Sequence, residues 1–239
     1  KLSVIIPVYN MSGHLRQCLL TIRETIRLPY EVIVVDDGSS DDECISIPNA
    51  GDDVYVLRSE VHRGFSHAVN MGIRASVGEV VLFLHADVLL APFAVEDMLD
   101  SLIHDAALGA VCAVASSVYE RAQRLPDTPY EGWNGFVATA AAIRAEKKAP
   151  HAELLAEMIA LMVRRDAVEA AGFLDERYTV PALAAYDYTL RMTKEGYAVT
   201  SLPNVYVHHD DRVYEWGACE QQEYEKFQAK WGLSLNYSF

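Results

Sequence analysis

The chain has 239 residues, of which 51% are hydrophobic and 10% aromatic, a composition that excludes a disordered chain and permits a large buried core. Its net charge of −14 at pH 7 argues against nucleic acid as a partner, because neutralising phosphates requires clustered Lys and Arg. The same acidity provides no polybasic patch for an anionic membrane surface.

Strands and helices alternate in the first half of the chain. Short apolar runs predict four strands: residues 2–7, 30–35, 54–57 and 79–84. The segments that follow three of these strands predict helices: residues 14–27, 66–76 and 92–104. This alternation predicts an α/β fold with a mostly parallel central sheet, flanked by helices and joined by right-handed crossovers.

The second half is less regular. Further strands are predicted at residues 108–118, 160–164, 199–201 and 205–208. Further helices are predicted at residues 165–171, 186–195 and 215–230, and the irregular stretch 119–150 contains an Ala-rich helix candidate. Because no repeat, linker or low-complexity segment interrupts the chain, we expect one domain over residues 1–239.

The sequence predicts no membrane-spanning helix, since the longest apolar run, 80–95, is interrupted by His85, Asp87 and Pro92. The four cysteines are far apart without metal-ligand spacing, so we expect free thiols in a cytoplasmic protein. Lys1 leads straight into a strand, which argues against a signal peptide. A start without Met suggests a piece of a longer protein.

Polar residues follow three of the predicted strands at the point where each strand ends. They are Tyr9 and Asn10, Asp36 and Asp37, and His85 and Asp87. The carboxyl ends of parallel strands meet at one edge of the sheet, where open α/β folds bind their ligands. The pattern therefore predicts a binding site at this edge and favours an enzyme.

Several motifs occur in an order that resembles family 2 glycosyltransferases of the GT-A fold. In the first 90 residues they are SVIIPVYN (3–10), EVIVVDDGSSD (31–41), HRGFSHAVNMG (62–72) and GEVVLFLHAD (78–87). Later motifs are MVRRDAVEAAGFLDERY (162–178), DYTLRMTKEGY (187–197) and FQAKWG (227–232). The resemblance implies a Rossmann-like nucleotide-binding half (1–90), an acceptor-side half (91–214) and a C-terminal helix and tail (215–239).

The resemblance implies that the first half binds a nucleoside-diphosphate sugar, with a UDP-sugar favoured. Pro7, Tyr9 and Asn10 are then expected to frame the base and ribose. Asp37, with Asp36 beside it, is expected to accept a hydrogen bond from the base or ribose, because charge-assisted hydrogen bonds are strong. The alternative is that this Asp-Asp-Gly-Ser-Ser segment is only a turn and helix cap.

Two residues of the third motif are expected near the diphosphate. Gly64 permits close approach of the backbone, and a helix N-terminus favours an anion. Asn70 lies in the same segment. The alternative reading is that Gly64 is an ordinary loop residue and that Asn70 only holds a neighbouring loop.

His85-Ala86-Asp87 occupies the position of the family's Asp-X-Asp motif, which implies a Mn²⁺ or Mg²⁺ cofactor. Asp87 is the expected ligand, and Ala86 and His85 are expected to line the substrate site. His85 departs from the family pattern; its imidazole suits Mn²⁺ better than Mg²⁺, or it contacts the ribose. We expect His208 as a late metal ligand, the alternative being a polar loop of solvated histidines.

The catalytic base is the least regular part of the resemblance. The family commonly carries Glu-Asp-X-Asp ahead of a helix, but here Ala184 and Ala185 replace the acidic pair and only Asp187 remains. Transfer with inversion requires a carboxylate within hydrogen-bond reach of the acceptor hydroxyl. We expect Asp187 in that role; Asp175 or Glu176 could serve instead, and Asp187 could merely cap the helix.

These expectations predict a glycosyltransferase of polysaccharide or glycoconjugate biosynthesis that moves a sugar from a nucleoside-diphosphate sugar to an unidentified acceptor, with inversion and with metal dependence. The alternative is a degenerate, non-catalytic domain that binds a sugar nucleotide or a partner. The substitution at Ala184 and Ala185 favours this alternative.

Overall fold

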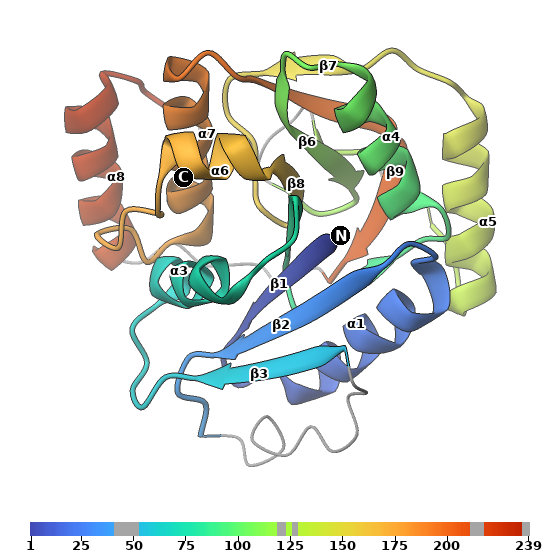
Figure 1. Cartoon of the computed structure of the whole chain (residues 1–239), viewed down its shortest axis with the longest axis horizontal. Coiled ribbons are helices and arrows are strands. Elements are labelled where there is room, and N and C mark those ends of the chain that lie inside the picture. The colour runs from blue at the N-terminus through green and yellow to red at the C-terminus, as the bar shows by residue number, and fades with distance from the viewer. Residues whose placement is uncertain (41–52, 119–122, 126–128, 211–217, 236–239) are drawn as a thin grey trace.

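A computed structural model of the chain describes residues 1–40, 53–118, 123–125, 129–210 and 218–235. Within these residues nine strands form one sheet, in the order β3-β2-β1-β4-β8-β6-β9-β5, with β7 paired to β9 (Figure 1). The strands are β1 (Leu2–Val8), β2 (Tyr30–Asp36), β3 (Val54–Arg58), β4 (Val80–Leu84), β5 (Val88–Leu90), β6 (Leu108–Ala115), β7 (His151–Glu153), β8 (Ala160–Arg164) and β9 (Ala198–His209).

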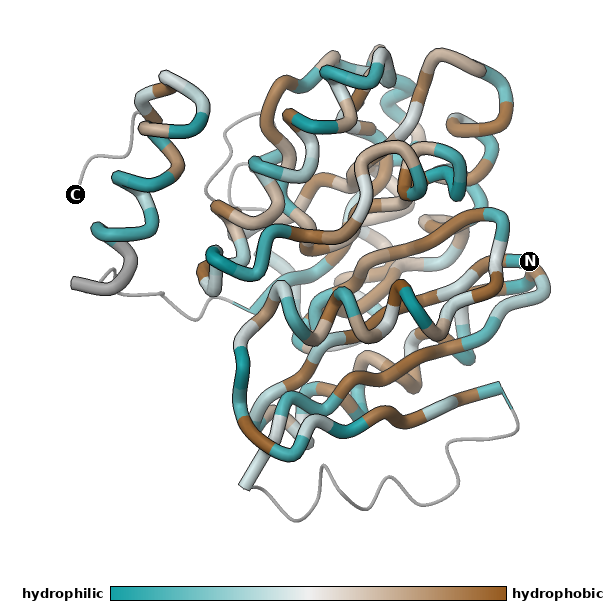
Figure 2. The backbone as a smooth tube through the Cα atoms, turned by 60° about the vertical axis from the view of Figure 1, so that its left-hand side comes forward, coloured by the Kyte–Doolittle hydropathy of each residue, from teal (hydrophilic) through white to brown (hydrophobic). Residues whose placement is uncertain are grey.

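Helices cover both faces of the sheet. They are α1 (Ser12–Thr25), α3 (Phe65–Ala75), α4 (Ala94–His104), α5 (Gly132–Ala145), α6 (Arg165–Ala171), α7 (Pro181–Lys194) and α8 (Ala218–Trp231). Helices α1, α4 and α5 share one hydrophobic core with one face, and α3, α6, α7 and α8 share a second core with the other. Figure 2 shows the strands as largely hydrophobic and α8 as largely hydrophilic. None of the helices in the described residues has the length and apolar character needed to cross a bilayer.

The apolar runs form strands because both faces of the sheet are covered. In β1, Val4 and Ile6 belong to the core on the α1 side, whereas Ile5 belongs to the core on the α3 side. All three are fully buried. Alternate side chains of a strand point to opposite faces, so a strand buried on both faces reads as a continuous apolar run.

The predicted fold class is confirmed: β1 pairs in parallel with β2 and β4, and β2 with β3. The chain runs outward from β1 to β3 and returns to place β4 on the other side of β1. This reversal opens a crevice at the carboxyl ends of β1 and β4. The second half adds antiparallel strands, since β8 is antiparallel to β4 and β6, and β5 and β7 are antiparallel to β9.

Several elements differ from those predicted; for example, β6 ends at Ala115, ahead of the predicted end at residue 118. A single strand, β9, replaces the two short strands expected around Pro203, because its pairing with β6 shifts register there and resumes at Tyr206. Helix α7 begins at Pro181, ahead of the expected start at residue 186, since Pro fits the first turn of a helix. The short strands β5 and β7 were not expected. Part of the predicted helix 215–230 lies outside the described residues.

Candidate active site

A cavity of about 740 Å³ lies at the carboxyl ends of β1, β2 and β4. Its wall also includes the end of β9, the segment that precedes β8, and the start of α7. Pro7, Tyr9, Asn10, Asp37 and Gly64 line it, together with His85, Ala86 and Asp87. The expectation that the polar ends of three strands meet at one edge is therefore met by the geometry.

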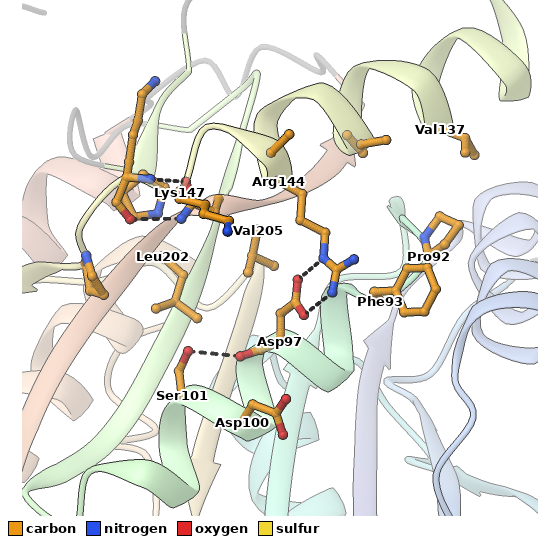
Figure 3. A pocket seen from close by; sticks show the side chains of 17 residues that line it. Pro92, Phe93, Asp97, Asp100, Ser101, Val137, Arg144, Lys147, Leu202 and Val205 are labelled. Carbon is orange, nitrogen blue, oxygen red and sulfur yellow. Dashed lines mark hydrogen bonds and ion pairs between the residues drawn. The ribbon is translucent and has the colours of Figure 1, made fainter.

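A second cavity, of about 710 Å³, lies between α4, α5 and β9 (Figure 3). Two of its charged groups are paired with each other: Arg144 of α5 contacts both carboxylate oxygens of Asp97 on α4, at 2.5 and 2.8 Å. The guanidinium of Arg144 also lies 4.6 Å from the ring centre of Phe93. Because the two cavities are similar in size, their chemistry decides between them, and the first holds a group of possible metal ligands.

These possible metal ligands are His85, Asp87 and His209, and together they are called the donor cluster. One ligand atom from each lies within 4.8 Å of the other two, a grouping that could hold a metal ion. Their positions follow from the sheet: His85 and Asp87 come directly after β4, and β5 pairs antiparallel with β9 so that Val88 faces His209. The Nε2 atom of His209 lies 3.4 Å from Oδ1 of Asp87.

The protonation of this cluster suits a cation. Burial lowers the pKa of His85 to about 4, although the negative charge of Asp87 acts to raise it. The imidazole of His85 is therefore neutral at physiological pH. For Asp87, burial acts to raise the pKa, but the hydrogen bond with His209 and the nearby imidazoles lower it to about 2. The cluster thus presents a carboxylate beside a neutral imidazole.

The hydrogen bonding of His209 fixes which nitrogen faces Asp87. Its Nδ1–H donates to the carbonyl oxygen of Ser117 at 2.7 Å, which directs Nε2 toward the Asp87 carboxylate. Burial acts to lower the pKa of His209, but Asp87, the Ser117 carbonyl and the charge of Glu157 raise it.

His208, the expected ligand, lies elsewhere. It hydrogen-bonds to the hydroxyl of Tyr130 and packs against the ring of Phe136, outside the cavity. Adjacent residues of a strand point to opposite faces, so only one of the two histidines can face Asp87. The choice of His208 is therefore corrected to His209, which the pairing of β9 with β5 places in the cavity.

The residues fit a metal ion. In addition to the grouping of the three donors, the buried Nε2 atom of His85 has no hydrogen-bond partner among the described residues. A buried polar atom without a partner is costly, and a bound cation satisfies it. Two imidazoles with one carboxylate suit Mn²⁺ better than Mg²⁺, which prefers oxygen ligands.

Asp37 lines the cavity but is buried, with 3% of its surface exposed. Its carboxylate accepts the backbone N–H groups of Arg63, at 3.1 Å, and of Gly64, at 2.6 Å. The Nδ1 atom of His62 lies 2.8 Å from it. Asp37 therefore holds the loop that leads into α3, and any contact with a ligand is made beside these bonds.

Asp36 does not line the cavity, contrary to its expected part in the binding site. Its carboxylate accepts hydrogen bonds from Arg58, at 2.6 Å, and from the backbone N–H of Ser39, at 2.9 Å. It is 1% exposed and ties the turn after β2 to β3. The turn interpretation therefore accounts for Asp36.

The residues after β1 form a further part of the cavity wall. Tyr9 is 41% exposed, and its ring stacks on that of His62 with 3.9 Å between centroids. Asn10 adopts a left-handed conformation with φ of 52°. Its backbone N–H donates to the Ser39 hydroxyl and its side-chain oxygen accepts the Ser40 N–H, both at 2.9 Å. These bonds join the loops that follow β1 and β2.

Two residues of the third motif, Gly64 and Asn70, differ in their positions relative to the cavity. Gly64 lines the cavity as the residue before α3, with φ of 97°, a conformation that favours glycine. A Cβ atom at this position would lie 3.1 Å from Thr179. Asn70 does not line the cavity; it holds Leu174 through bonds of 3.0 and 2.8 Å to its backbone. Asn70 thus holds a neighbouring loop, as the alternative reading had it.

The start of α7 forms a wall that the sequence did not indicate. Thr179, Val180 and Ala182 line the cavity. Glu223 of α8 accepts the backbone N–H groups of Thr179 and Val180, at 2.9 and 3.0 Å, and so holds the segment that leads into α7. A contact supplied from so far along the chain leaves no local sequence signal.

Asp187 does not line the cavity, which argues against its predicted role as the base. It lies in α7 with no exposed surface, where Nε of Arg191 contacts it at 2.9 Å. Lys230 and Trp231 of α8 bind its other oxygen, at 2.6 and 2.9 Å. Asp187 therefore joins α7 to α8, and it is not a helix cap either.

The other two acids considered for this role are also occupied. Asp175 is paired with Arg177 at 2.6 Å and with Lys230 at 2.9 Å. Glu176 contacts Arg63 and His67, at 3.2 and 3.3 Å. Neither lines the cavity.

Comparison with known proteins places this geometry in context. The model of the glycosyl transferase family 2 matches residues 3–169. The glycosyltransferase GlyG of Streptococcus pneumoniae serotype 4 is 32% identical over 104 residues, which are 42% of this chain and 33% of GlyG. The chain thus matches about a third of the length of this curated relative.

Two solved structures share the fold. The mannosyltransferase PcManGT of Pyrobaculum calidifontis, in complex with GDP-Man and Mn²⁺, aligns with a TM-score of 0.67 at 21% identity, over 96% of this chain and 63% of its own. GalNAc-T7 with UDP, GalNAc and Mn²⁺ aligns with a TM-score of 0.74 at 17% identity, over 97% of this chain and 48% of its own. At these identities the similarity establishes the GT-A fold.

Proposed function

The chain belongs to glycosyl transferase family 2, and on that premise we propose that it transfers a sugar from a nucleoside-diphosphate sugar to an acceptor hydroxyl, with inversion at the anomeric carbon. The observation that carries this proposal is the cluster of His85, Asp87 and His209 on the cavity that the first motifs line. We propose one domain, with residues 1–90 binding the donor and residues 91–214 facing the acceptor.

The metal-binding part of the proposal rests on the donor set. His85, Asp87 and His209 would hold Mn²⁺ or Mg²⁺, which supplies positive charge to stabilise the departing diphosphate. The two imidazoles favour Mn²⁺. The similar structures that contain Mn²⁺ support the same assignment.

The loops after β1 and β2 bind the donor's nucleoside in this proposal. Tyr9 offers an exposed ring, and Pro7, Asn10 and Asp37 line the same wall. The Asp37 carboxylate holds the loop before α3 in place, so that Gly64 leaves room for the diphosphate. A UDP-sugar is the favoured donor, and the acceptor takes the opposite side of the cavity, beside the start of α7.

The alternative of a degenerate domain that binds without turnover is favoured by two observations. Ala184 and Ala185 are fully buried and carry no acid, and Asp187 is tied to α8. A domain of that kind still binds a nucleoside diphosphate. Turnover therefore separates the two functions, whereas binding is common to both.

The proposal is tested by titrating UDP and GDP into the protein by calorimetry, with Mn²⁺ and with EDTA. Asp87→Ala should weaken the Mn²⁺-dependent binding at least about tenfold, or ~1.4 kcal/mol. Asp100→Ala, a change at an exposed aspartate of the second cavity, serves as the control. Equal binding with EDTA and in the Asp87 variant would refute the assignment, and a screen for donor hydrolysis distinguishes the enzyme from the binding domain.

A further inference from the structure

Glu157 places a carboxylate in the cavity wall that neither the motifs nor the proposed function accounts for. It lies just before β8, which runs antiparallel to β4 with Ala160 opposite Leu84. The backbone N–H of His85 donates to the carbonyl oxygen of Ile159 at 2.9 Å. Because the two strands are antiparallel, residues that precede β8 lie beside those that follow β4, which are the donor residues His85 and Asp87.

Glu157 is held in this position by a neighbouring side chain. Its backbone N–H donates to the side-chain oxygen of Gln123 at 2.7 Å, and the Gln123 amide nitrogen lies 3.4 Å from the Glu157 carbonyl oxygen. Gln123 is fully buried, and Glu157 is 7% exposed. Glu157 and His209 line the same cavity, and the charge of Glu157 contributes to the raised pKa of His209. The bonds with Gln123 fix the backbone of Glu157 at the cavity wall, from which its side chain extends.

The remaining carboxylates of the described cavity wall have other tasks. Asp87 belongs to the donor cluster. Asp37 accepts the N–H groups of the loop before α3. Asp210 lies 2.8 Å from Nε2 of His14, and its side chain is 45% exposed at the rim. Among the described carboxylates of the wall, Glu157 is the one that is both buried and part of the acceptor-side half of the chain (residues 91–214).

We propose that Glu157 is the general base of the transfer, in place of the acids that Ala184 and Ala185 replace. The inference rests on the proposed function. The Glu157 carboxylate takes the proton of the acceptor O–H as that oxygen forms its bond to the anomeric carbon. The bond from the anomeric carbon to the diphosphate oxygen breaks, its electron pair leaves with the nucleoside diphosphate, and the proton on Glu157 passes to solvent.

The test compares Glu157→Gln with Glu169→Gln, a matched change at an exposed residue of α6. Donors are UDP-GlcNAc, UDP-GalNAc and GDP-mannose with Mn²⁺, and water is the O–H acceptor, so no acceptor needs to be known. Glu157→Gln should lower the turnover of donor by about 10²–10⁴-fold. Its melting temperature and its calorimetric affinity for UDP and GDP should match those of the control, because glutamine preserves the shape of the side chain.

A second measurement distinguishes a base from a structural residue. Azide attacks the anomeric carbon without losing a proton, so it does not need a base. Sodium azide should therefore restore turnover to Glu157→Ala, with formation of the glycosyl azide, and should not accelerate the wild-type protein.

Each outcome decides the proposal. Turnover of Glu157→Gln within a few-fold of the control, weakened nucleotide binding, or no rescue by azide would overturn the role of Glu157 while leaving the proposed function intact. A wild-type protein that binds nucleotide without turning over any donor would overturn the role of Glu157 and favour the degenerate domain. A wild-type protein that binds no nucleoside diphosphate would overturn the proposed function as well.

Discussion

Replacing Asp187 with Asn should destabilise the fold rather than remove a catalytic group. The carboxylate is fully buried between α7 and α8, where it contacts Arg191 and Lys230, at 2.9 and 2.6 Å, and Trp231 at 2.9 Å. The amide keeps the size of the side chain but carries no charge, and its NH₂ group must face a donor. Two cations then lose the anion they share.

The size of the effect follows from how buried these partners are. Breaking a fully buried ion pair costs about 3–5 kcal/mol. The side chains of Arg191 and Lys230 are 21% and 30% exposed, so water offsets part of the loss and we expect ~2–3 kcal/mol. For a domain of this length each kcal/mol lowers the melting temperature by about 2–4 °C, which gives a fall of roughly 4–12 °C.

Thermal melting and nucleotide titration of the same samples measure this prediction. Asp100→Asn, at an exposed position on α4, is the matched control and should melt with the wild type. Below the transition, Asp187→Asn should bind UDP with wild-type affinity and retain turnover. A variant with the wild-type melting temperature but without turnover would refute this account and restore Asp187 as the base.

Two further predictions concern the metal cluster. His209→Ala should weaken the binding of Mn²⁺ at least about tenfold in a direct titration. The control is His208→Ala, a change at the adjacent residue that contacts Tyr130, and it should leave Mn²⁺ binding unchanged. The reverse result would indicate that His208 is the ligand. The affinity for Mn²⁺ should rise as the pH rises through the raised pKa of His209, because only the neutral imidazole has a lone pair that can bind the metal. His85, with a pKa of about 4, is already neutral and adds no pH dependence near neutrality. Titrations between about pH 5.5 and 8.5 measure this dependence, and an affinity that falls with rising pH would contradict it.

The sequence predicted the first half of the fold well because its signals are local. Buried parallel strands are continuous apolar runs, and the polar residues that follow them lie at one edge by the geometry of the sheet. Tyr9, Asp37 and Asp87 reach the cavity for this reason. Asp36 shares the pattern of Asp37, yet the neighbouring strand β3 supplies Arg58 to bind it, a contact that no local pattern encodes.

The parts that were missed depend on pairing between distant segments. Whether His208 or His209 faces Asp87 depends on the register of β9 against β5. Alternation along the strand indicates that one of them faces the core, but not which one. Asp187 was misassigned because its partners Lys230 and Trp231 lie on α8, far along the chain. Glu157 had no motif, and only the antiparallel pairing of β8 with β4 places it near the donor residues.

The departures from the family pattern lie around one cavity. At the donor cluster, His85 occupies the place of the first Asp of the family's motif, which lowers the negative charge there; for a bound cation this would favour Mn²⁺ over Mg²⁺. At the start of α7, Ala184 and Ala185 are packed into the core, where a charged acid would be costly. A chain that had only lost function would leave the cavity without a positioned acid. Glu157 remains in the wall, buried and with its backbone held by Gln123, which favours a catalytic site with a relocated base over a degenerate one.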